Sequence, residues 1–245
     1  MIFLFTDFGA SGPYLGQMEA VIRQSAPDVA VIDLVSNAPV ADPVRSSYLL
    51  AALSRQLPDD SVFLCVVDPG VGGMRHPVVL RAGTQWFVGP DNGLFNTVAL
   101  QATGIEWRIV DWRPDRLSRS FHGRDLFAPI AARVACGDFD WAYHPYPGPL
   151  LVNWPQNLAE IIYIDHYGNA VTGLRYQAAD AGSWLVLEGM RIAEAGTFSD
   201  VPDGTPFWYC NSMELIEIAV NRGRADQVLP CRPGQRVSLE RCRVE

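Results

Sequence analysis

The chain has 245 residues, 49% of them hydrophobic, which is enough apolar material to bury a large core in one domain or in two of unequal size. Its formal net charge of -8 argues against wholesale binding to nucleic acid or to an anionic membrane surface, because either would need a basic field. Charged residues or glycine interrupt the apolar stretches well before the roughly 20 residues of a membrane span, and no basic leader precedes Thr6-Asp7, so we expect a cytoplasmic protein without nucleic-acid or membrane partners.

The first 70 residues alternate β-rich runs with helical patterns. The predicted elements are a strand at 2–6, a helix at 14–24, a strand at 29–34, a helix that follows Asp42-Pro43, and a strand at 62–67. Asp42 can cap the second helix, and Pro43 suits its first turn. This βαβαβ order predicts a parallel sheet that places its ligand at the carboxyl ends of the strands.

The following segment completes a larger domain. A hairpin is predicted from 77–81 and 85–89 around Ala82-Gly83-Thr84, and then a helix at 94–102, a strand at 106–110 and a helix after Arg124. We therefore predict an α/β fold whose N-terminal part, residues 1–145, is doubly wound and Rossmann-like.

Proline marks the predicted domain boundary. Residues 142–155 contain Tyr-His-Pro-Tyr-Pro-Gly-Pro and Asn-Trp-Pro, a density that excludes helix and favours an extended linker, which we place at 146–157. The later β-rich runs lie at 160–164, 184–187, 190–192, 207–210 and 236–239. They predict a small, mostly β, barrel-like domain over residues 158–245.

The segment Asp68-Pro69-Gly70-Val71-Gly72-Gly73-Met74-Arg75 sets a carboxylate at the end of a buried strand and a guanidinium seven residues later. The glycines allow the loop to turn Arg75 back toward Asp68, which predicts a buried pair of opposite charge. Spacing alone leaves two interpretations open, a structural ion pair that holds the loop and part of a catalytic site.

Two other residues stand at expected ligand positions. Asp7 closes the first strand, where it could meet the ribose hydroxyls of a nucleoside or instead cap the helix that follows. His122 lies just before the last helix of the first domain, where the positive end of the helix dipole would keep it neutral and able to accept a proton. It could equally be an ordinary loop histidine.

Cofactor motifs are missing from the sequence. It contains neither G-x-G-x-x-G nor G-x-x-x-x-G-K-[ST], and its five cysteines are scattered without C-x-x-C or zinc spacing. We therefore predict no metal site and no cofactor. A nicotinamide-dependent dehydrogenase is disfavoured for the same reason.

Three further motifs carry weaker signals. Gly89-Pro90-Asp91-Asn92-Gly93 has the composition of a tight turn. The segment Asp165-His166-Tyr167-Gly168-Asn169 combines an acid, an aromatic ring and an amide, which could hold a purine nucleoside. Asn211-Ser212 and the Glu217 to Arg222 run could offer backbone groups to a base edge, although a turn and regular secondary structure explain them equally well.

Taken in order, these motifs resemble the S-adenosyl-L-methionine hydroxide adenosyltransferase family, which is related to the fluorinase and chlorinase. The resemblance spans nearly the whole chain and is carried by six segments: Thr6-Asp7-Phe8-Gly9, 66–72 with Arg75, 89–93, Phe121-His122-Gly123-Arg124-Asp125, 164–169, and Asn211-Ser212 with 217–221. It implies hydrolysis of S-adenosyl-L-methionine to adenosine and L-methionine without a metal. It also implies a homotrimer whose substrate lies between one subunit's first domain and its neighbour's second.

The resemblance also implies roles for individual residues. The catalytic set that binds water falls on Asp68, Arg75 and His122. The substrate-binding set falls on Asp7, Phe8, Asp165, Tyr167, Asn169, Phe198, Asn211, Ser212, Asn221 and Arg222. Within it, Asp7 would hold the ribose hydroxyls, Phe198 would stack on adenine and Ser212 would meet the methionine carboxylate.

This chain departs from the family pattern at two positions. Gly12 stands where the family usually carries an Asp that grips the substrate's amino group, and Glu214 stands where it usually carries glycine. One carboxylate near the amino-acid end of the substrate is thus missing and another has been gained. Recognition of methionine is the part of the function that these changes put in question.

The residues support in-line attack of an activated water on the ribose 5' carbon. Arg75 would stabilise developing hydroxide, while Asp68 and His122 would orient the water and accept its proton. The alternatives are a non-catalytic protein that binds S-adenosylmethionine or adenosine, and a halogenase. Asp68 disfavours the halogenase, because the halogenases carry tyrosine at that motif position and a carboxylate would repel a halide.

Overall fold

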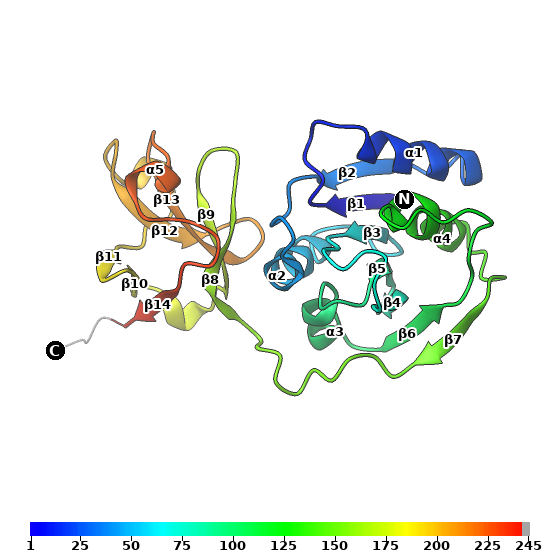
Figure 1. Cartoon of the computed structure of the whole chain (residues 1–245). Coiled ribbons are helices and arrows are strands. Elements are labelled where there is room, and N and C mark those ends of the chain that lie inside the picture. The colour runs from blue at the N-terminus through cyan, green and yellow to red at the C-terminus, as the bar shows by residue number, and fades with distance from the viewer. Residues whose placement is uncertain (242–245) are drawn as a thin grey trace. The chain divides into compact units, whose positions relative to one another are not determined.

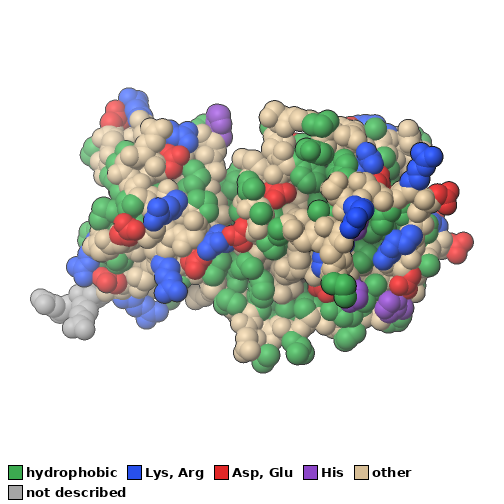
Figure 2. Space-filling model, viewed as in Figure 1, with side chains coloured by type: hydrophobic (Ala, Val, Ile, Leu, Met, Phe, Trp, Pro, Cys, Tyr) green, Lys and Arg blue, Asp and Glu red, His purple; other side chains and the backbone are tan. Residues whose placement is uncertain are grey.

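The computed structural model describes residues 1–241, which divide into two compact units, Met1–Trp154 and the described residues from Pro155 onward (Figure 1). The mixed α/β class predicted from the sequence is confirmed. No helix within the described residues is long and apolar enough to cross a membrane. On the face shown in Figure 2, acidic and basic side chains are interspersed rather than separated by sign.

A seven-stranded sheet forms the centre of the first unit, with strand order β2-β1-β3-β5-β4-β6-β7. The strands are β1 (Ile2–Thr6), β2 (Val31–Val35), β3 (Val62–Val66), β4 (Pro77–Ala82), β5 (Gln85–Pro90), β6 (Ile105–Val110) and β7 (Tyr143–Tyr146). The first four strands of that spatial order are parallel to one another, and the remaining neighbours are antiparallel. Every residue of β1 and β3 is buried, because parallel strands are covered on both faces.

Helices cover the two faces of this sheet. On one face, α1 (Tyr14–Ser25) and α4 (Ala128–Ala135) share a core with Leu4 of β1 and Leu64 of β3. On the other face, Phe63 stacks on Phe87 with ring centroids 4.7 Å apart, and Phe87 contacts Phe95 at the start of α3 (Asn96–Gln101). Successive side chains of a strand point to opposite faces, so the apolar runs of β1 and β3 feed both layers.

The helix and hairpin predictions near the middle of the first unit are confirmed. The second helix, α2 (Pro43–Ser54), begins after Asp42, whose side chain accepts a hydrogen bond from the Arg45 amide at 3.0 Å. Strands β4 and β5 form the predicted hairpin, and Gly83 in its turn has a φ of 61°.

Two boundaries differ from the sequence prediction. The helix expected after Arg124 begins two residues earlier, at Gly123, as a π-helical turn, η1 (Gly123–Phe127), before it continues as α4. In the proline-rich segment, residues 143–146 form β7 and pair with β6, so the predicted linker, 146–157, overlaps a strand at Tyr146. Proline is tolerated there because β7 is an edge strand.

The second unit is built from two small sheets. One has the order β12-β13-β9-β8, formed by β8 (Leu158–Ile164), β9 (Ala170–Arg175), β12 (Pro206–Cys210) and β13 (Leu215–Val220). The other has the order β11-β10-β14, formed by β10 (Trp184–Leu187), β11 (Met190–Ile192) and β14 (Val237–Glu240). Its helices are the short turns η2 (Ala178–Asp180), η3 (Phe198–Asp200) and α5 (Ala225–Val228).

Isolated bridges link the edges of the two sheets. Glu160 pairs with Arg236, and Glu194 pairs with Trp208. These bridges join β8 to the segment before β14 and the residues after β11 to β12, so the strands close on one another around a core that includes the fully buried Trp208.

Candidate active site

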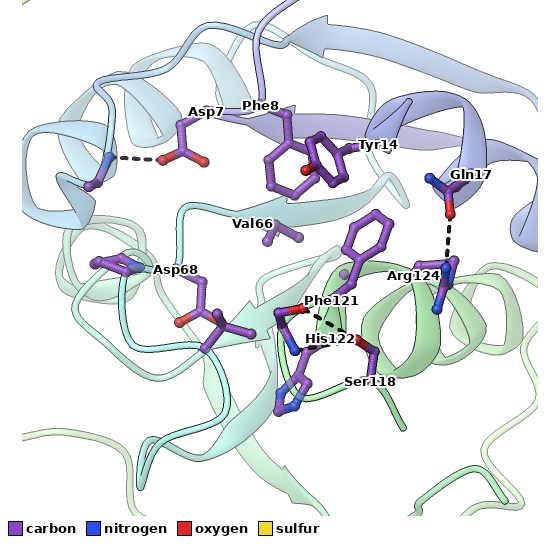
Figure 3. Close-up of a pocket in the computed structure, with 15 residues that line it drawn as sticks. Asp7, Phe8, Tyr14, Gln17, Val66, Asp68, Ser118, Phe121, His122 and Arg124 are labelled. Atoms are coloured by element: carbon purple, nitrogen blue, oxygen red, sulfur yellow. Dashed lines mark hydrogen bonds between the residues drawn. The ribbon is translucent and has the colours of Figure 1, made fainter. Parts of the chain in front are cut away.

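A cavity of about 490 Å³ opens in the first unit at the carboxyl ends of β1 and β3 (Figure 3). Thr6 and Val66 are paired across these parallel strands, so the residues that follow them reach the same edge of the sheet. Asp7, Phe8, Asp68 and His122, all predicted as site residues, line the cavity. The lining residues that were not predicted are Tyr14, Gln17, Ala41, Val66, Pro69, Val71, Ser118, Ser120, Phe121, Gly123 and Arg124.

Asp68, Arg75 and His122 form one connected group. Nε and Nη2 of Arg75 donate to Oδ2 of Asp68 at 3.0 and 2.5 Å, and Nη2 also lies 2.9 Å from Nδ1 of His122. The Asp68 and Arg75 side chains are only 4% and 9% exposed. Arg75 also lies over the Phe127 ring, with its Cζ 5.2 Å from the centroid. The arginine therefore sits behind the cavity wall, where it fixes two groups that reach the cavity.

The glycine-rich loop makes this pairing possible. Val71 donates to the Asp68 carbonyl and Gly73 donates to the Gly70 carbonyl, so the chain turns twice before Arg75. Gly72 has a φ of 76°, and a Cβ there would lie 2.5 Å from the Arg119 carbonyl oxygen. Only glycine fits that position, which confirms the prediction that the loop returns Arg75 to Asp68.

The contact with Arg75 determines the tautomer of His122. A guanidinium can only donate, so Nδ1 must accept, and the ring proton of the neutral imidazole is on Nε2. Burial lowers the pKa of His122 and the nearby Arg75 charge lowers it further. This lowered pKa agrees with the neutral imidazole predicted from the sequence, and burial is its first cause and Arg75 its second.

Asp7 does not cap the helix that follows it. Helix α1 begins after Pro13 and has no side-chain cap, whereas Oδ2 of Asp7 accepts a hydrogen bond from the Ala41 amide at 2.8 Å. Ala41 has a φ of 54°, an uncommon conformation for a residue other than glycine. The carboxylate is thus held at the cavity by a backbone turn from a distant part of the chain.

One side of the cavity is aromatic. Phe8, Tyr14 and Phe121 are in mutual contact, with ring centroids 5.3 to 5.9 Å apart. Figure 3 shows these rings together, with Asp7 and Asp68 across the cavity from them. Tyr14 is the first residue of α1, and nothing in its local sequence distinguishes it from an ordinary helix start.

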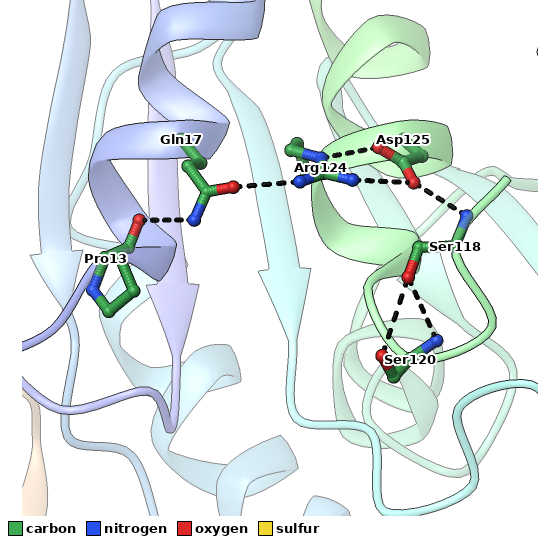
Figure 4. A network of polar contacts seen from close by, with 6 residues as sticks. All are labelled: Pro13, Gln17, Ser118, Ser120, Arg124 and Asp125. Carbon is green, nitrogen blue, oxygen red and sulfur yellow. Dashed lines mark hydrogen bonds and ion pairs between the residues drawn. The ribbon is translucent and has the colours of Figure 1, made fainter. Parts of the chain in front are cut away.

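A polar network holds this side in place (Figure 4). Arg124 donates to both carboxylate oxygens of Asp125 and to Oε1 of Gln17, and Gln17 donates to the Pro13 carbonyl. Asp125 accepts from the Ser118 amide, and the hydrogen bond from Arg124 is the main reason that the pKa of Asp125 is lowered. The network therefore ties α1 to η1 and to the loop before it.

In the second unit, several predicted residues gather around Glu217. Glu217 is 5% exposed and accepts hydrogen bonds from the Tyr209 hydroxyl and from Nδ2 of Asn211, each at 2.7 Å. Asn169 also contacts it and donates to Asp165 at 3.2 Å. Burial raises the pKa of Glu217. A carboxylate within the apolar strand Leu215–Val220 is the sequence signal that could have identified it.

Other predicted residues of the second unit have different surroundings. Phe198 packs edge-on against Tyr209, with ring centroids 5.7 Å apart, and so joins the Glu217 group. Tyr167 is 73% exposed. Nδ2 of Asn221 donates to the Val201 carbonyl at 2.8 Å, and Arg222 pairs with Asp203 at 3.2 Å. Ser212 lies exposed in the turn that the Asn211 side chain closes.

The two positions that depart from the family pattern are both in turns. Gly12 has a φ of 123°, and no atom lies within 4 Å of where its Cβ would be. Glu214 has a φ of 61°, the left-handed conformation that favours glycine, and its carboxylate pairs with Arg175 at 2.8 Å. The left-handed backbone conformation at 214 thus explains why glycine is expected there. The glutamate that replaces it forms an ion pair within the same unit.

No three His, Cys, Asp or Glu side chains in residues 1–241 are grouped so as to hold a metal ion.

Comparison with known proteins covers both units. Residues 2–142 match the sequence model of the SAM hydroxide adenosyltransferase N-terminal domain, and residues 159–238 match that of its C-terminal domain. A protein of Thermus thermophilus named (R)-S-adenosyl-L-methionine hydrolase is 36% identical, over 97% of this chain and 98% of its own. One of the same name from Salinispora arenicola is 35% identical, over 96% of this chain and 95% of its own.

Solved structures agree with this match. An uncharacterised conserved protein from Thermotoga maritima has a TM-score of 0.89 and 30% identity, covering 98% of this chain and all of that one. A conserved hypothetical protein from Thermus thermophilus has a TM-score of 0.77 and 33% identity, covering 98% of this chain and 99% of that one. The family resemblance read from the motifs is therefore confirmed: the chain belongs to the SAM hydroxide adenosyltransferase family.

Proposed function

We propose that this protein hydrolyses S-adenosyl-L-methionine to adenosine and L-methionine. The observation that carries the proposal is the group formed by Asp68, Arg75 and His122 at a cavity that Asp7 also lines, in a chain whose relatives are named S-adenosylmethionine hydrolases. The relatives' names specify the (R) configuration at sulfur, and we extend that preference to this chain.

The reaction suits a dry, shaped cavity. The sulfonium substrate carries a good leaving group, because departure of methionine turns the sulfur into a neutral thioether. Attack of hydroxide on the ribose 5' carbon therefore destroys charge, and a site of low dielectric favours that transition state over separated ions. Asp7 is the residue we assign to the ribose hydroxyls, since only one of its oxygens is taken up by the Ala41 amide.

We assign proton acceptance to Asp68 rather than to His122. The Nδ1 lone pair of His122 is occupied by Arg75, and its Nε2 carries the ring proton, so the imidazole has no free acceptor. Asp68 lines the cavity and keeps lone pairs beyond those bonded to Arg75. Arg75 stabilises the hydroxide as it forms, and the Nε2–H of His122 orients the water.

The second unit supplies the adenosine-binding side in this proposal. Asp165, Tyr167 and Asn169 would surround the nucleoside, Phe198 would stack on adenine, and Ser212 would meet the methionine carboxylate; Phe8, Asn211, Asn221 and Arg222 complete the set. The Glu217 group supports this assignment because it fixes the side chains of Asn169 and Asn211. Because its side chain is held in this way, we assign Asn211 an indirect role: it closes the turn that carries Ser212 and does not contact the substrate itself.

We further propose a homotrimer in which one subunit's first domain, residues 1–145, and its neighbour's second, residues 158–245, complete each site. Large apolar side chains that stand in solvent support an assembly of this kind: Val40, Met74, Leu150 and Val152 are 78 to 96% exposed. The cytoplasm is the compartment we propose, since Cys65 and Cys231 are buried thiols that suit a reducing environment.

The experiment is incubation of the purified protein with each sulfur epimer of S-adenosylmethionine, with adenosine and methionine followed by chromatography. We expect both products in equal amounts, and we expect Asp68→Ala to lower kcat at least about 100-fold. Because we propose that no cofactor takes part, prior treatment with a chelator should leave the rate unchanged. Bound but unconverted substrate would instead favour a binding protein, and a halonucleoside formed in chloride or fluoride would favour a halogenase.

A further inference from the structure

The aromatic side of the cavity consists of three rings that take no part in binding the attacking water. Phe8 and Tyr14 lie 5.5 Å apart, and each contacts Phe121, at 5.9 and 5.3 Å between ring centroids. Phe121 is only 9% exposed and forms the base of the group, whereas Tyr14 is 49% exposed. All three rings line the cavity.

These rings are not equally available to a ligand. The guanidinium of Arg124 lies over Phe121, with its Cζ 5.2 Å from the ring centroid, and Arg124 is itself held by Asp125 and Gln17. A cation thus already occupies one face of Phe121. Phe8 and Tyr14 are the two rings of the group left to meet a positively charged ligand.

The charges around the cavity point the same way. Its lining carboxylates are Asp7 and Asp68; Asp68 is neutralised by Arg75, and one oxygen of Asp7 is bonded to the Ala41 amide. A sulfonium sulfur carries no hydrogen and its charge is diffuse, so it cannot donate a hydrogen bond to a carboxylate and gains little stabilisation from one. Aromatic faces attract such cations through the ring quadrupole and tolerate their methyl groups.

We propose that Phe8 and Tyr14, supported by Phe121, form the subsite for the sulfonium centre of the substrate. This assignment rests on the proposed function, because that function supplies the sulfonium. It gives Phe8 a specific task within the substrate-binding set and adds Tyr14 to that set. On this assignment the leaving group faces the rings, and the attacking water faces Asp68 and His122.

The proposal predicts a particular division between binding and rate. The sulfur carries its full charge in the bound substrate and loses part of it in the transition state, so attraction to the rings is strongest before reaction. Such an interaction lowers KM without raising kcat. Removing a ring should therefore weaken binding while leaving kcat the same or somewhat higher.

The variants are Tyr14→Leu and Phe8→Leu, with Tyr14→Phe as the conservative change that keeps the ring. We expect each leucine variant to raise KM for S-adenosylmethionine about 3- to 30-fold, with kcat within about twofold of wild type or above it. Tyr14→Phe should behave like wild type. The matched control is Tyr143→Leu, which removes a part-exposed aromatic ring from β7, outside the cavity.

A binding measurement separates this proposal from the hydrolase proposal. Calorimetry would compare sinefungin, in which a protonated amine replaces the sulfonium, with the neutral thioether S-adenosylhomocysteine. We expect the leucine variants to lose affinity for sinefungin about 3- to 30-fold while affinity for the thioether changes less than about twofold. Because neither ligand reacts, this result does not depend on turnover.

Equal loss of affinity for both ligands would overturn the proposal, since it would show that the rings only shape the cavity. A fall in kcat at unchanged KM would overturn it as well. If the wild type hydrolyses S-adenosylmethionine but either of these results is found, the hydrolase function stands and the sulfonium subsite fails. If the leucine variants lose affinity for sinefungin but not for the thioether, and the wild type yields no adenosine, the subsite stands and the hydrolase function fails.

Discussion

His122 occupies a position where a positive charge is unfavourable. Its Nδ1 accepts from Arg75, whose guanidinium lies 2.9 Å away, and the side chain is partly buried. Protonation would break that hydrogen bond and set two cations against each other. The charge state of this one residue therefore controls whether the water-binding group stays assembled.

We expect kcat/KM to fall on the acid side, with a midpoint below the ordinary histidine pKa of about 6.5. Burial and Arg75 hold the pKa of His122 below that of the unfolded chain. The unfolded state then binds more protons between the two pKa values, so stability is present above about pH 6.5 and declines as pH falls through that window. Measured pH profiles of activity and of unfolding by urea test both parts.

The control is His122→Gln, which cannot titrate in this range. Its unfolding profile should lose the pH dependence that His122 contributes, while its activity is low at every pH. An acid limb that persists unchanged in the stability profile of His122→Gln would show that another group is responsible.

At the scale of the element, the loop from Asp68 to Arg75 is shaped by backbone constraints. The strand β3 delivers Asp68, and the turns at Val71 and Gly73 bring Arg75 back within seven residues. The loop thus has no regular secondary structure, and its conformation depends on glycine at position 72.

Gly72→Ala tests this dependence. A Cβ there would combine a positive φ with a 2.5 Å contact to the Arg119 carbonyl, so we expect a loss of about 2–4 kcal/mol in unfolding free energy and a large loss of activity. Gly104→Ala is the matched control, because its φ is 72° but no atom lies within 4 Å of the new Cβ. It should lose only about 1 kcal/mol and keep its activity. Equal effects of the two changes would mean that φ alone matters.

At the scale of the whole molecule, the proposed trimer makes each site depend on two chains. Asp68→Ala disables the first unit, and Asn169→Ala disables the proposed adenosine side of the second. If sites form between subunits, trimers co-assembled from the two inactive variants contain some sites with both native halves. Random mixing gives about a quarter of all sites in that form.

Purification through both tags removes trimers made of one variant alone, and each mixed trimer has one of its three sites with both native halves. We therefore expect co-expression of the two variants, carrying different tags and purified through both, to recover about a third of the wild-type activity. The same variants purified separately and assayed without subunit exchange should remain inactive. Sedimentation would report the oligomeric state. Mixed assemblies without activity would place each complete site within one subunit and contradict the proposal.

The sequence determined the parts of this protein that local patterns encode. The apolar runs of β1 and β3 and the acids that follow them, the Asp42 cap and the Gly83 turn could all be read from a few consecutive residues, because burial, capping and turn formation act over that range. The family motifs could be recognised for the same reason, since each lies within a few consecutive residues. Asp7, Asp68 and His122 were thereby identified before their positions were known.

Tertiary structure alone decided which groups meet. Arg75 and His122 are 47 residues apart in the chain, Arg124 and Gln17 are 107 apart, and Asp7 is held by Ala41 rather than by its own helix. The tautomer of His122, the availability of Phe8 and Tyr14, and the group around Glu217 follow from such contacts. Packing between distant segments is set by the whole core, so no local pattern could have specified these partners.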